Sequence, residues 1–281
     1  MAIKITSDST CDLNDIVKAR DIGILPLQVH LDSKSYRDGV DITPQDIFSF
    51  VARTKILPKT SAPSVAEYEE FFAEQLKTAD EVIHFNISQK SSGSHNFAKL
   101  AAESFKGKVH VIDSKALSSG QGLLVLKACD LRDEGKSASE IVAAVEELRE
   151  RTNTSFVPDQ LDYLHKGGRC SGMKMLVANT LKIHPKIVMK DGQLMQGGKY
   201  MGNMVRCISR YVADLKAEYP SYDKTRCFVT HSSAEPALVE AAKAKVKELF
   251  DFNEVIETVA GSIVTSHCGK GTLGVLFIYN N

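Results

Sequence analysis

The sequence has no excess of charge of either sign, and this limits the partners that it can bind. Lysine and arginine together total 35 residues, as do aspartate and glutamate, so the formal net charge is +0. Nucleic-acid binding draws on a surplus of clustered cations. We therefore expect no nucleic-acid partner, whereas a small acidic ligand needs only a local site.

Long apolar runs are also missing. No stretch approaches the roughly 18 apolar residues that a membrane-spanning helix needs. The polar segment Ser7-Asp8-Ser9-Thr10 follows the first apolar residues too closely for a signal peptide. We expect a cytoplasmic protein whose contact with membranes is only transient.

Cysteine pairs of the Cys-x-x-Cys type are absent. In a chain of this size without a signal peptide, scattered cysteines are expected to be reduced thiols, and neither a zinc site nor another metal site is predicted. The six cysteines are Cys11, Cys129, Cys170, Cys207, Cys227 and Cys268.

The sequence also lacks a convincing nucleotide-binding motif. Residues 269–274 match G-x-G-x-x-G, but a strand-like run follows them in place of the helix that a dinucleotide site requires. No Walker sequence is present. We expect no cofactor.

What the first half of the chain does have is an alternation of strands and helices. Thr43-Pro44 and the capping-box spacings that begin at Ser64 and Ser137 predict three helix starts. Strands are expected at residues 2–5, 22–31, 81–87 and 108–112. Such alternation predicts an N-terminal α/β domain, over residues 1–155, with a mainly parallel sheet and flanking helices.

The second half, residues 156–281, has a different pattern. Asp191-Gly192 between two apolar runs predicts a hairpin, and strand-like runs near the end of the chain predict an α+β domain with a mixed or antiparallel sheet. The expected helices are a short one at 161–164 that ends at Gly167-Gly168, and longer ones at 173–181, 203–217 and 235–249; the expected strands include 227–230, 262–265 and 273–279.

Short hydroxyl side chains follow three of the strands expected in the first half. They lie in residues 7–10, in 91–94, and in 113–114 with 118–120. In a parallel sheet these strand ends meet at one edge, where helix N-termini and hydroxyl groups favour an anionic ligand. Serine is also an ordinary helix cap, so one such loop alone would indicate little.

An alternative reading is a Ser/His/Asp esterase or acyl hydrolase built from Ser92, His267 and Asp8. The chain has no G-x-S-x-G elbow, so only geometry can assemble such a triad. Cys268, next to His267, is a weaker nucleophile candidate, because adjacent residues of a strand point to opposite faces.

Taken in order along the chain, the loop motifs resemble one family. The matching stretches are Ser7-Asp8-Ser9-Thr10 with Asp12-Leu13, Pro26-Leu27, residues 36–41, Lys59-Thr60-Ser61-Ala62-Pro63-Ser64, Ser91-Ser92-Gly93, Val111-Ile112-Asp113-Ser114, residues 161–164 with Lys166-Gly167-Gly168-Arg169, and His267-Cys268-Gly269-Lys270-Gly271. This series resembles the DegV family, the fatty-acid-binding subunits of bacterial fatty acid kinase.

The resemblance implies a non-catalytic carrier of a long-chain fatty acid. The acyl chain is expected in an apolar tunnel between the two domains, with its carboxylate presented to a separate kinase subunit that converts it to an acyl phosphate. A carrier of another amphipathic carboxylate is the remaining alternative. The residues expected at the ligand are Thr60, Ser92 and His267, with Gly93, Ser61, Ser9 and Ser114, and Arg169 is expected to contact the phosphoryl group or the kinase.

The chain departs from the family pattern in its last loop. The family motif there is His-x-Gly-Pro-Gly, and Lys270 stands where the proline is usual. This places an additional cation beside the expected carboxylate site.

Overall fold

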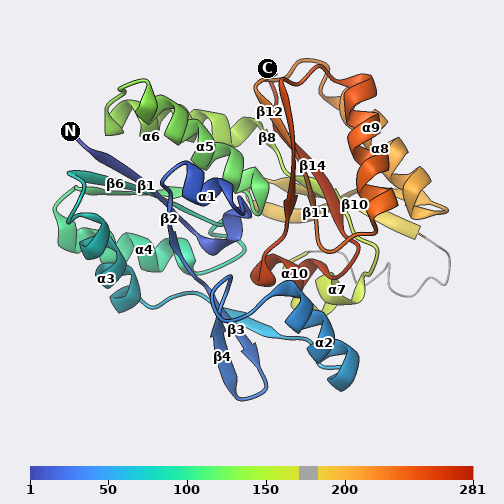
Figure 1. Cartoon of the computed structure of the whole chain (residues 1–281), viewed down its shortest axis with the longest axis horizontal. Coiled ribbons are helices and arrows are strands. Elements are labelled where there is room, and N and C mark those ends of the chain that lie inside the picture. The colour runs from blue at the N-terminus through green and yellow to red at the C-terminus, as the bar shows by residue number, and fades with distance from the viewer. Residues whose placement is uncertain (171–182, 281) are drawn as a thin grey trace.

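The computed structural model describes residues 1–170 and 183–280 (Figure 1). Within them the strands form three sheets. In Figure 1 the first sheet lies on the left and the second on the right, and the small third sheet lies below. Helices α10 (Ser262–Cys268) and α7 (Asp162–Gly167) lie beneath the second sheet. The helix predicted at residues 173–181 falls outside the described residues.

The first sheet is the predicted parallel sheet of the N-terminal half. Its strands run in the order β2-β1-β6-β7, all parallel. Their bounds are β1 (Ile3–Asp8), β2 (Gly23–Leu25), β6 (Glu81–Asn86) and β7 (Val109–Asp113). The carboxyl ends of β1, β6 and β7 therefore meet at one edge, as the hydroxyl-rich loops predict.

Helices cover both faces of this sheet. Successive side chains of a strand point to opposite faces, and each face packs against its own set of helices. Val82 packs with the core of α3 and α4, whereas its neighbour Ile83 packs with that of α5 and α6. The helices are α1 (Ile16–Ala19), α3 (Val65–Gln75), α4 (Ser94–Ala102), α5 (Ser119–Asp133) and α6 (Ala138–Leu148), with short 3-10 turns η1 (Ser9–Cys11), η2 (Glu103–Phe105) and η3 (Arg149–Arg151).

The three predicted helix starts are confirmed. Thr43, Ser64 and Ser137 each cap a helix through a reciprocal capping box, the first of them at α2 (Pro44–Thr54). Each cap satisfies backbone N–H groups that the first helical turn leaves without a partner.

The second sheet is mixed, as predicted for the C-terminal half. Its order is β11-β10-β9-β14-β12-β13, with β8 paired to β14; β12 and β13 are parallel and the other pairs are antiparallel. Its strands are β8 (Thr152–Asn153), β9 (Ser155–Val157), β10 (Ile183–Lys190), β11 (Gln193–Met201), β12 (Arg226–His231), β13 (Glu254–Val259) and β14 (Leu273–Ile278). Helices α8 (Met204–Glu218) and α9 (Pro236–Leu249) share a core with it.

The prediction of one strand over residues 22–31 is wrong, because the chain changes sheets at Pro26. Proline has no N–H to donate to a ladder, and it interrupts the strand. β2 stays in the first sheet, whereas β3 (Gln28–Leu31) pairs antiparallel with β4 (Lys34–Arg37) and β5 (Lys59–Ser61) in the third.

The strand predicted at residues 262–265 is also wrong, because these residues begin helix α10 (Ser262–Cys268). Two buried carboxyl groups, those of Asp12 and Asp38, hold the N-terminus of this helix. Asp12 accepts a hydrogen bond from the Gly261 N–H at 2.8 Å, and Asp38 accepts one from the Ser262 N–H at 2.8 Å. These contacts satisfy N–H groups that the first turn of the helix leaves without a partner. They therefore stabilise a helix here, although the β-branched residues of the segment favour a strand.

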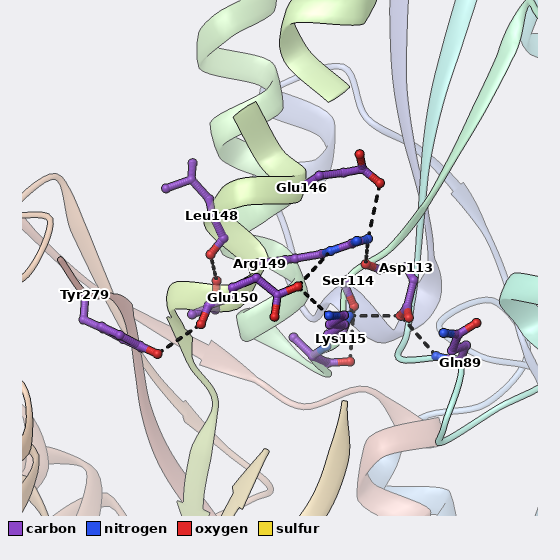
Figure 2. A network of polar contacts seen from close by, with 11 residues as sticks. Gln89, Asp113, Ser114, Lys115, Glu146, Leu148, Arg149, Glu150 and Tyr279 are labelled. Atoms are coloured by element: carbon purple, nitrogen blue, oxygen red, sulfur yellow. Dashed lines mark hydrogen bonds and ion pairs between the residues drawn. The ribbon is translucent and has the colours of Figure 1, made fainter. Parts of the chain in front are cut away.

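A network of polar contacts joins the two larger sheets (Figure 2). Arg149 donates to the carbonyl of Asp113 at the end of β7, at 3.1 Å, and the Tyr279 hydroxyl beyond β14 donates to the carbonyl of Glu150 at 3.0 Å. The second sheet begins near this junction, with Thr152. The domain boundary at residue 155 itself stays a prediction.

Burial sets the protonation of the carboxyl groups at α10. Asp12 is almost fully buried, which raises its pKa to about 8 although Ser118 and Gly261 donate hydrogen bonds to it. The nearby Asp38 carboxylate raises the pKa of Asp12 further. Burial likewise raises the pKa of Asp38.

The raised pKa of Asp12 predicts that stability falls as pH rises. In the unfolded chain this carboxyl ionises near pH 3.8, so between that value and about 8 the folded state holds a proton that the unfolded state has lost. The contribution is complete below about pH 4 and is lost towards pH 8. We expect Asp12→Asn, which stays neutral, to reduce the slope of unfolding free energy against pH by up to about 1.4 kcal/mol per pH unit.

Urea unfolding at several pH values between 5 and 8 measures this slope. The exposed Asp15 provides a matched control, and Asp15→Asn is expected to leave the slope unchanged. Equal slopes for wild type and Asp12→Asn would contradict the assignment of a raised pKa to Asp12.

Candidate functional site

A cavity of about 320 Å³ lies between the two halves of the chain. Ligand pockets commonly measure about 300–1,000 Å³. β5, the start of α4, the end of β6, α10, β11 and the segment after α7 (Asp162–Gly167) contribute to its wall. The residues that line it are Leu27, Thr60, Ser61, Ala62, Ile87, Ser91, Ser92, Gly93, Phe97, Leu117, Arg169, Leu194, Ile263, Val264, His267 and Cys268.

Polar groups gather in one part of this lining. A hydrogen bond of 2.8 Å joins Thr60 Oγ1 to His267 Nε2, although the two residues lie 207 positions apart in the chain. The neighbouring Ser61 hydroxyl lies 2.8 Å from Nε2 of His30, and this contact fixes β5 against β3. The structure therefore brings Thr60 and His267 together, whereas the Ser61 hydroxyl contacts His30, although Ser61 also lines the cavity.

Ser92 and Gly93 reach the cavity from the loop before α4. Gly93 is the N-cap residue of that helix. The Ser92 hydroxyl accepts a hydrogen bond from the Ser94 N–H at 3.2 Å and lies 2.9 Å from the Ser94 hydroxyl. A helix N-terminus with hydroxyl groups beside it favours a negatively charged group.

His267 is electrically neutral at physiological pH. Burial, and then the positive charge of Arg169, lower its pKa to about 4. Its Nδ1 atom is buried and has no hydrogen-bond partner among the described residues. Gly167 packs against this atom so closely that a Cβ at position 167 would lie 2.8 Å from it. The imidazole is thus fixed in place, and only its Nε2 side has a polar partner.

Arg169 stands at the exposed side of the cavity. Helix α7, the short helix predicted near residue 161, ends at Gly168, whose positive φ of 68° reverses the chain. Arg169 follows directly and donates to the Gly167 carbonyl at 2.7 Å. Its guanidinium group is therefore held near His267, and among the described residues this is the hydrogen bond that it donates.

Ser9 and Ser114 do not line this cavity. Ser9 donates to Asp38 at 2.8 Å and accepts from the Leu27 N–H at 3.2 Å, so it supports the turn between β2 and β3. Ser114 donates to the Ala116 carbonyl at 3.2 Å and lies in the junction network of Figure 2. Both hydroxyls organise loops near the site.

The apolar part of the lining was missed by the sequence reasoning. Ile263, Val264, His267 and Cys268 all face the cavity, which is the spacing of one face of a helix. The sequence pattern predicts a strand at residues 262–265, and in a strand these side chains would not share a face. A glycine at 261 before the apolar run and another at 269 after it were the available signals for a short helix.

The catalytic triad considered above is not assembled by these residues. Within the described residues no hydrogen bond joins Ser92 to His267, whose partner is Thr60. Asp8 is buried at the end of β1, where it accepts hydrogen bonds from Thr10, Gln121 and the Ile87 N–H. Burial raises the pKa of Cys268 to about 12, so its thiol stays protonated and is a poor nucleophile.

Comparison with known proteins identifies the family. The family model described as "Uncharacterised protein, DegV family" matches residues 2–280. The chain belongs to the DegV family. A DegV domain-containing protein of Clostridium acetobutylicum is 35% identical over 98% of this chain and 98% of its own length.

Solved DegV structures share the fold. A DegV protein from Thermus thermophilus, described as fatty-acid binding, is 30% identical, covers 100% of both chains and has a TM-score of 0.93. A DegV protein from Ruminococcus gnavus, in a structure described with vaccenic acid, is 25% identical with a TM-score of 0.88, covering 98% of this chain and 99% of its own. The DegV recognition and the two-part α/β fold predicted from the sequence are thus confirmed.

The described residues were also searched for membrane-spanning helices and for metal-binding groups. Among the helices that the structure describes, none combines the length and the apolar character needed to cross a membrane. In the same part of the chain, no group of three or more His, Cys, Asp or Glu side chains is arranged to hold a metal ion.

We expect the imidazole of His267 to titrate with a pKa of about 4, because burial and Arg169 disfavour its charged form. An NMR titration of the histidine resonances, assigned with a His267→Gln variant, measures this value. Arg169→Gln should raise it by removing a nearby positive charge. A resonance of His267 that titrates near the ordinary 6.5 would contradict the described burial.

Proposed function

We propose that this DegV protein binds a long-chain fatty acid in the cavity between its two halves. The observation that carries the proposal is one cavity whose lining combines apolar side chains with hydroxyl groups, one of them, Thr60, hydrogen-bonded to a neutral histidine. An amphipathic carboxylate is the ligand that matches both parts. Related DegV structures described with fatty acids support this choice.

The carboxylate belongs at the polar end, beside Thr60, Ser92 and His267. The Thr60 and Ser92 hydroxyls can each donate a charge-assisted hydrogen bond to a carboxylate oxygen. The backbone N–H of Gly93 offers a further donor, with no side chain in the way. A bound carboxylate would also favour the protonated form of His267, because an opposite charge nearby raises the pKa of an imidazole.

The acyl chain supplies most of the affinity. Burying about 14 methylene groups at roughly 0.8 kcal/mol each gives about 11 kcal/mol before the entropic cost of association is subtracted. A hydrogen bond to a charged group contributes about 1.5–3 kcal/mol. The polar end therefore fixes which end of the ligand faces outward, while the apolar wall holds the chain.

We further propose that the protein does no chemistry itself and presents the carboxylate to a separate ATP-using kinase subunit, which converts it to an acyl phosphate. Arg169 supports this proposal, since its exposed guanidinium lies at the same cavity as His267. The planar fork of arginine suits a phosphoryl group.

The head-group assignment predicts different effects for two substitutions of Thr60. Thr60→Val removes the hydroxyl and keeps the shape, and we expect it to weaken fatty-acid binding roughly tenfold. Thr60→Ser keeps the hydroxyl and should bind like the wild type. Titration of palmitate followed by native mass spectrometry measures both affinities. Wild-type affinity in Thr60→Val combined with Ser92→Ala would exclude these hydroxyls as carboxylate ligands.

If Arg169 acts in presenting the carboxylate to the kinase, its substitution should affect the rate of phosphorylation and not the affinity for the fatty acid. Arg169→Gln should leave palmitate affinity nearly unchanged and slow acyl phosphate formation by roughly tenfold or more. The assay combines the loaded protein, a bacterial fatty acid kinase subunit and ATP, and traps the product with hydroxylamine. The exposed Arg53 on α2 gives the matched control, Arg53→Gln. Equal rates for Arg169→Gln and wild type would remove Arg169 from this role.

A further inference from the structure

The loop of residues 87–93, which brings Ser92 to the cavity, is attached at its base to the N-terminal half. The N–H groups of its first three residues donate to Asp8, to the Ala116 carbonyl and to Asp113, at 2.8, 2.9 and 3.1 Å. These partners lie at or just beyond the carboxyl ends of β1 and β7. The base of the loop is therefore fixed on the first sheet.

A hydrogen bond of Ser88 ties the same loop to the C-terminal half. The hydroxyl group of Ser88, which is fully buried, donates to the carbonyl of Gly192 at 2.6 Å. Gly192 lies in the turn of the β10–β11 hairpin, and Leu194, two residues further on, lines the cavity. Among the described residues, this is the one hydrogen bond that residues 87–93 make with the C-terminal half.

The hairpin turn fits closely against Ser88. A Cβ at position 192 would lie 2.6 Å from the Ser88 hydroxyl oxygen and 3.7 Å from the Cα of Lys115. Both central residues of the turn have a positive φ, 48° at Asp191 and 76° at Gly192, as two-residue hairpin turns commonly require. Glycine at 192 therefore serves both the turn and the contact with Ser88.

Ser88 also organises the turn that carries Ser92. Its carbonyl accepts hydrogen bonds from the N–H groups of Ser91 and Ser92, at 2.8 and 3.2 Å. Its hydroxyl accepts a further one from the Lys90 N–H at 3.3 Å. A displacement of Ser88 would therefore also displace the backbone of Ser92.

We infer that Ser88 is a positioning residue of the proposed carboxylate site, because its bond to Gly192 holds Ser92 in place relative to the C-terminal half. The inference rests on the proposed function. That site combines Ser92 from one half of the chain with His267 from the other, so its geometry depends on contacts between the halves. A donor that shifts out of line weakens its hydrogen bond, since the strength falls with distance and angle.

The test compares the binding of palmitate with that of 1-hexadecanol, which has an equally long chain and no carboxylate. Ser88→Ala removes the bond to Gly192 without changing a residue of the cavity lining. We expect it to lower the preference for palmitate roughly fivefold and to change the affinity for hexadecanol by less than about twofold. Native mass spectrometry with the two ligands in competition measures the preference.

A double-mutant cycle tests whether Ser88 acts through Ser92. Ser92→Ala alone should lower the preference for palmitate at least as far as Ser88→Ala does. Adding Ser88→Ala to Ser92→Ala should then change little, because the hydroxyl that Ser88 positions is missing. Losses that multiply in the double variant would overturn the inference, since the two residues would then act independently.

Ser155→Ala is the matched control for Ser88→Ala. Ser155 is also fully buried and its hydroxyl lies 2.9 Å from that of Tyr211, but it does not line the cavity. Its substitution should leave the preference for palmitate unchanged.

Gly192→Ala disturbs the same contact from the side of the hairpin and should also lower the preference for palmitate. Its matched control is Gly135→Ala. Gly135 has a positive φ of 81°, but a Cβ there would have no atom within 4 Å. Both variants therefore strain the backbone, and only Gly192→Ala presses on Ser88.

The outcomes separate the inference from the function on which it rests. A wild-type protein that binds neither ligand, or that shows no preference for palmitate, would overturn the proposed carboxylate site. A wild-type preference that persists in Ser88→Ala, folded as judged by thermal unfolding, would overturn the inference alone. Equal losses for palmitate and hexadecanol in Ser88→Ala would also overturn it, because they would reflect general loosening of the fold.

Discussion

Two buried carboxyl groups at the start of α10 hold the geometry on which the rest of the site depends. Asp12 comes from the loop after β1 and Asp38 from the turn after β4, and they accept hydrogen bonds from consecutive backbone N–H groups of residues 261 and 262. The partners lie 249 and 224 positions apart in sequence. These contacts attach a helix of the C-terminal half to two loops of the N-terminal half.

Burying the Asp12 and Asp38 carboxyl groups costs free energy, which their hydrogen bonds offset. A buried carboxyl loses its hydration, which raises the pKa of both groups. Ser118 donates to Asp12 at 2.5 Å and Ser9 donates to Asp38 at 2.8 Å, so each carboxyl also has a hydroxyl partner. The helix so fixed sets the position of His267, and with it the polar end of the proposed ligand site.

The features that the sequence predicted well depend on local signals. The capping boxes at Ser64 and Ser137 involve residues three positions apart, and the parallel sheet follows from apolar runs that alternate with helices. The identity of α10 depends instead on carboxylates from distant loops. Its Ile, Val and Thr residues favour a strand when considered alone, so local propensity gave the wrong element.

The same distinction applies to the site. Thr60, Ser92 and His267 could be named because their motifs resemble those of the DegV family, and the structure places all three at one cavity. Ser9 and Ser114 belong to equally hydroxyl-rich loops, but a sequence does not reveal the direction of a hydroxyl, and theirs point to loop contacts. The apolar wall required knowing that α10 is a helix and which of its faces is turned inward.

We expect one cavity to hold a carboxylate at Thr60 and His267 and an acyl chain along α10. A crystal structure of the protein grown with palmitate tests it most directly. We predict carboxylate oxygens within hydrogen-bond distance of the Thr60 and Ser92 hydroxyls, with the chain against the apolar side chains of Ile263 and Val264. Palmitate bound with its carboxylate at another place, or a cavity that stays empty at saturating palmitate, would contradict it.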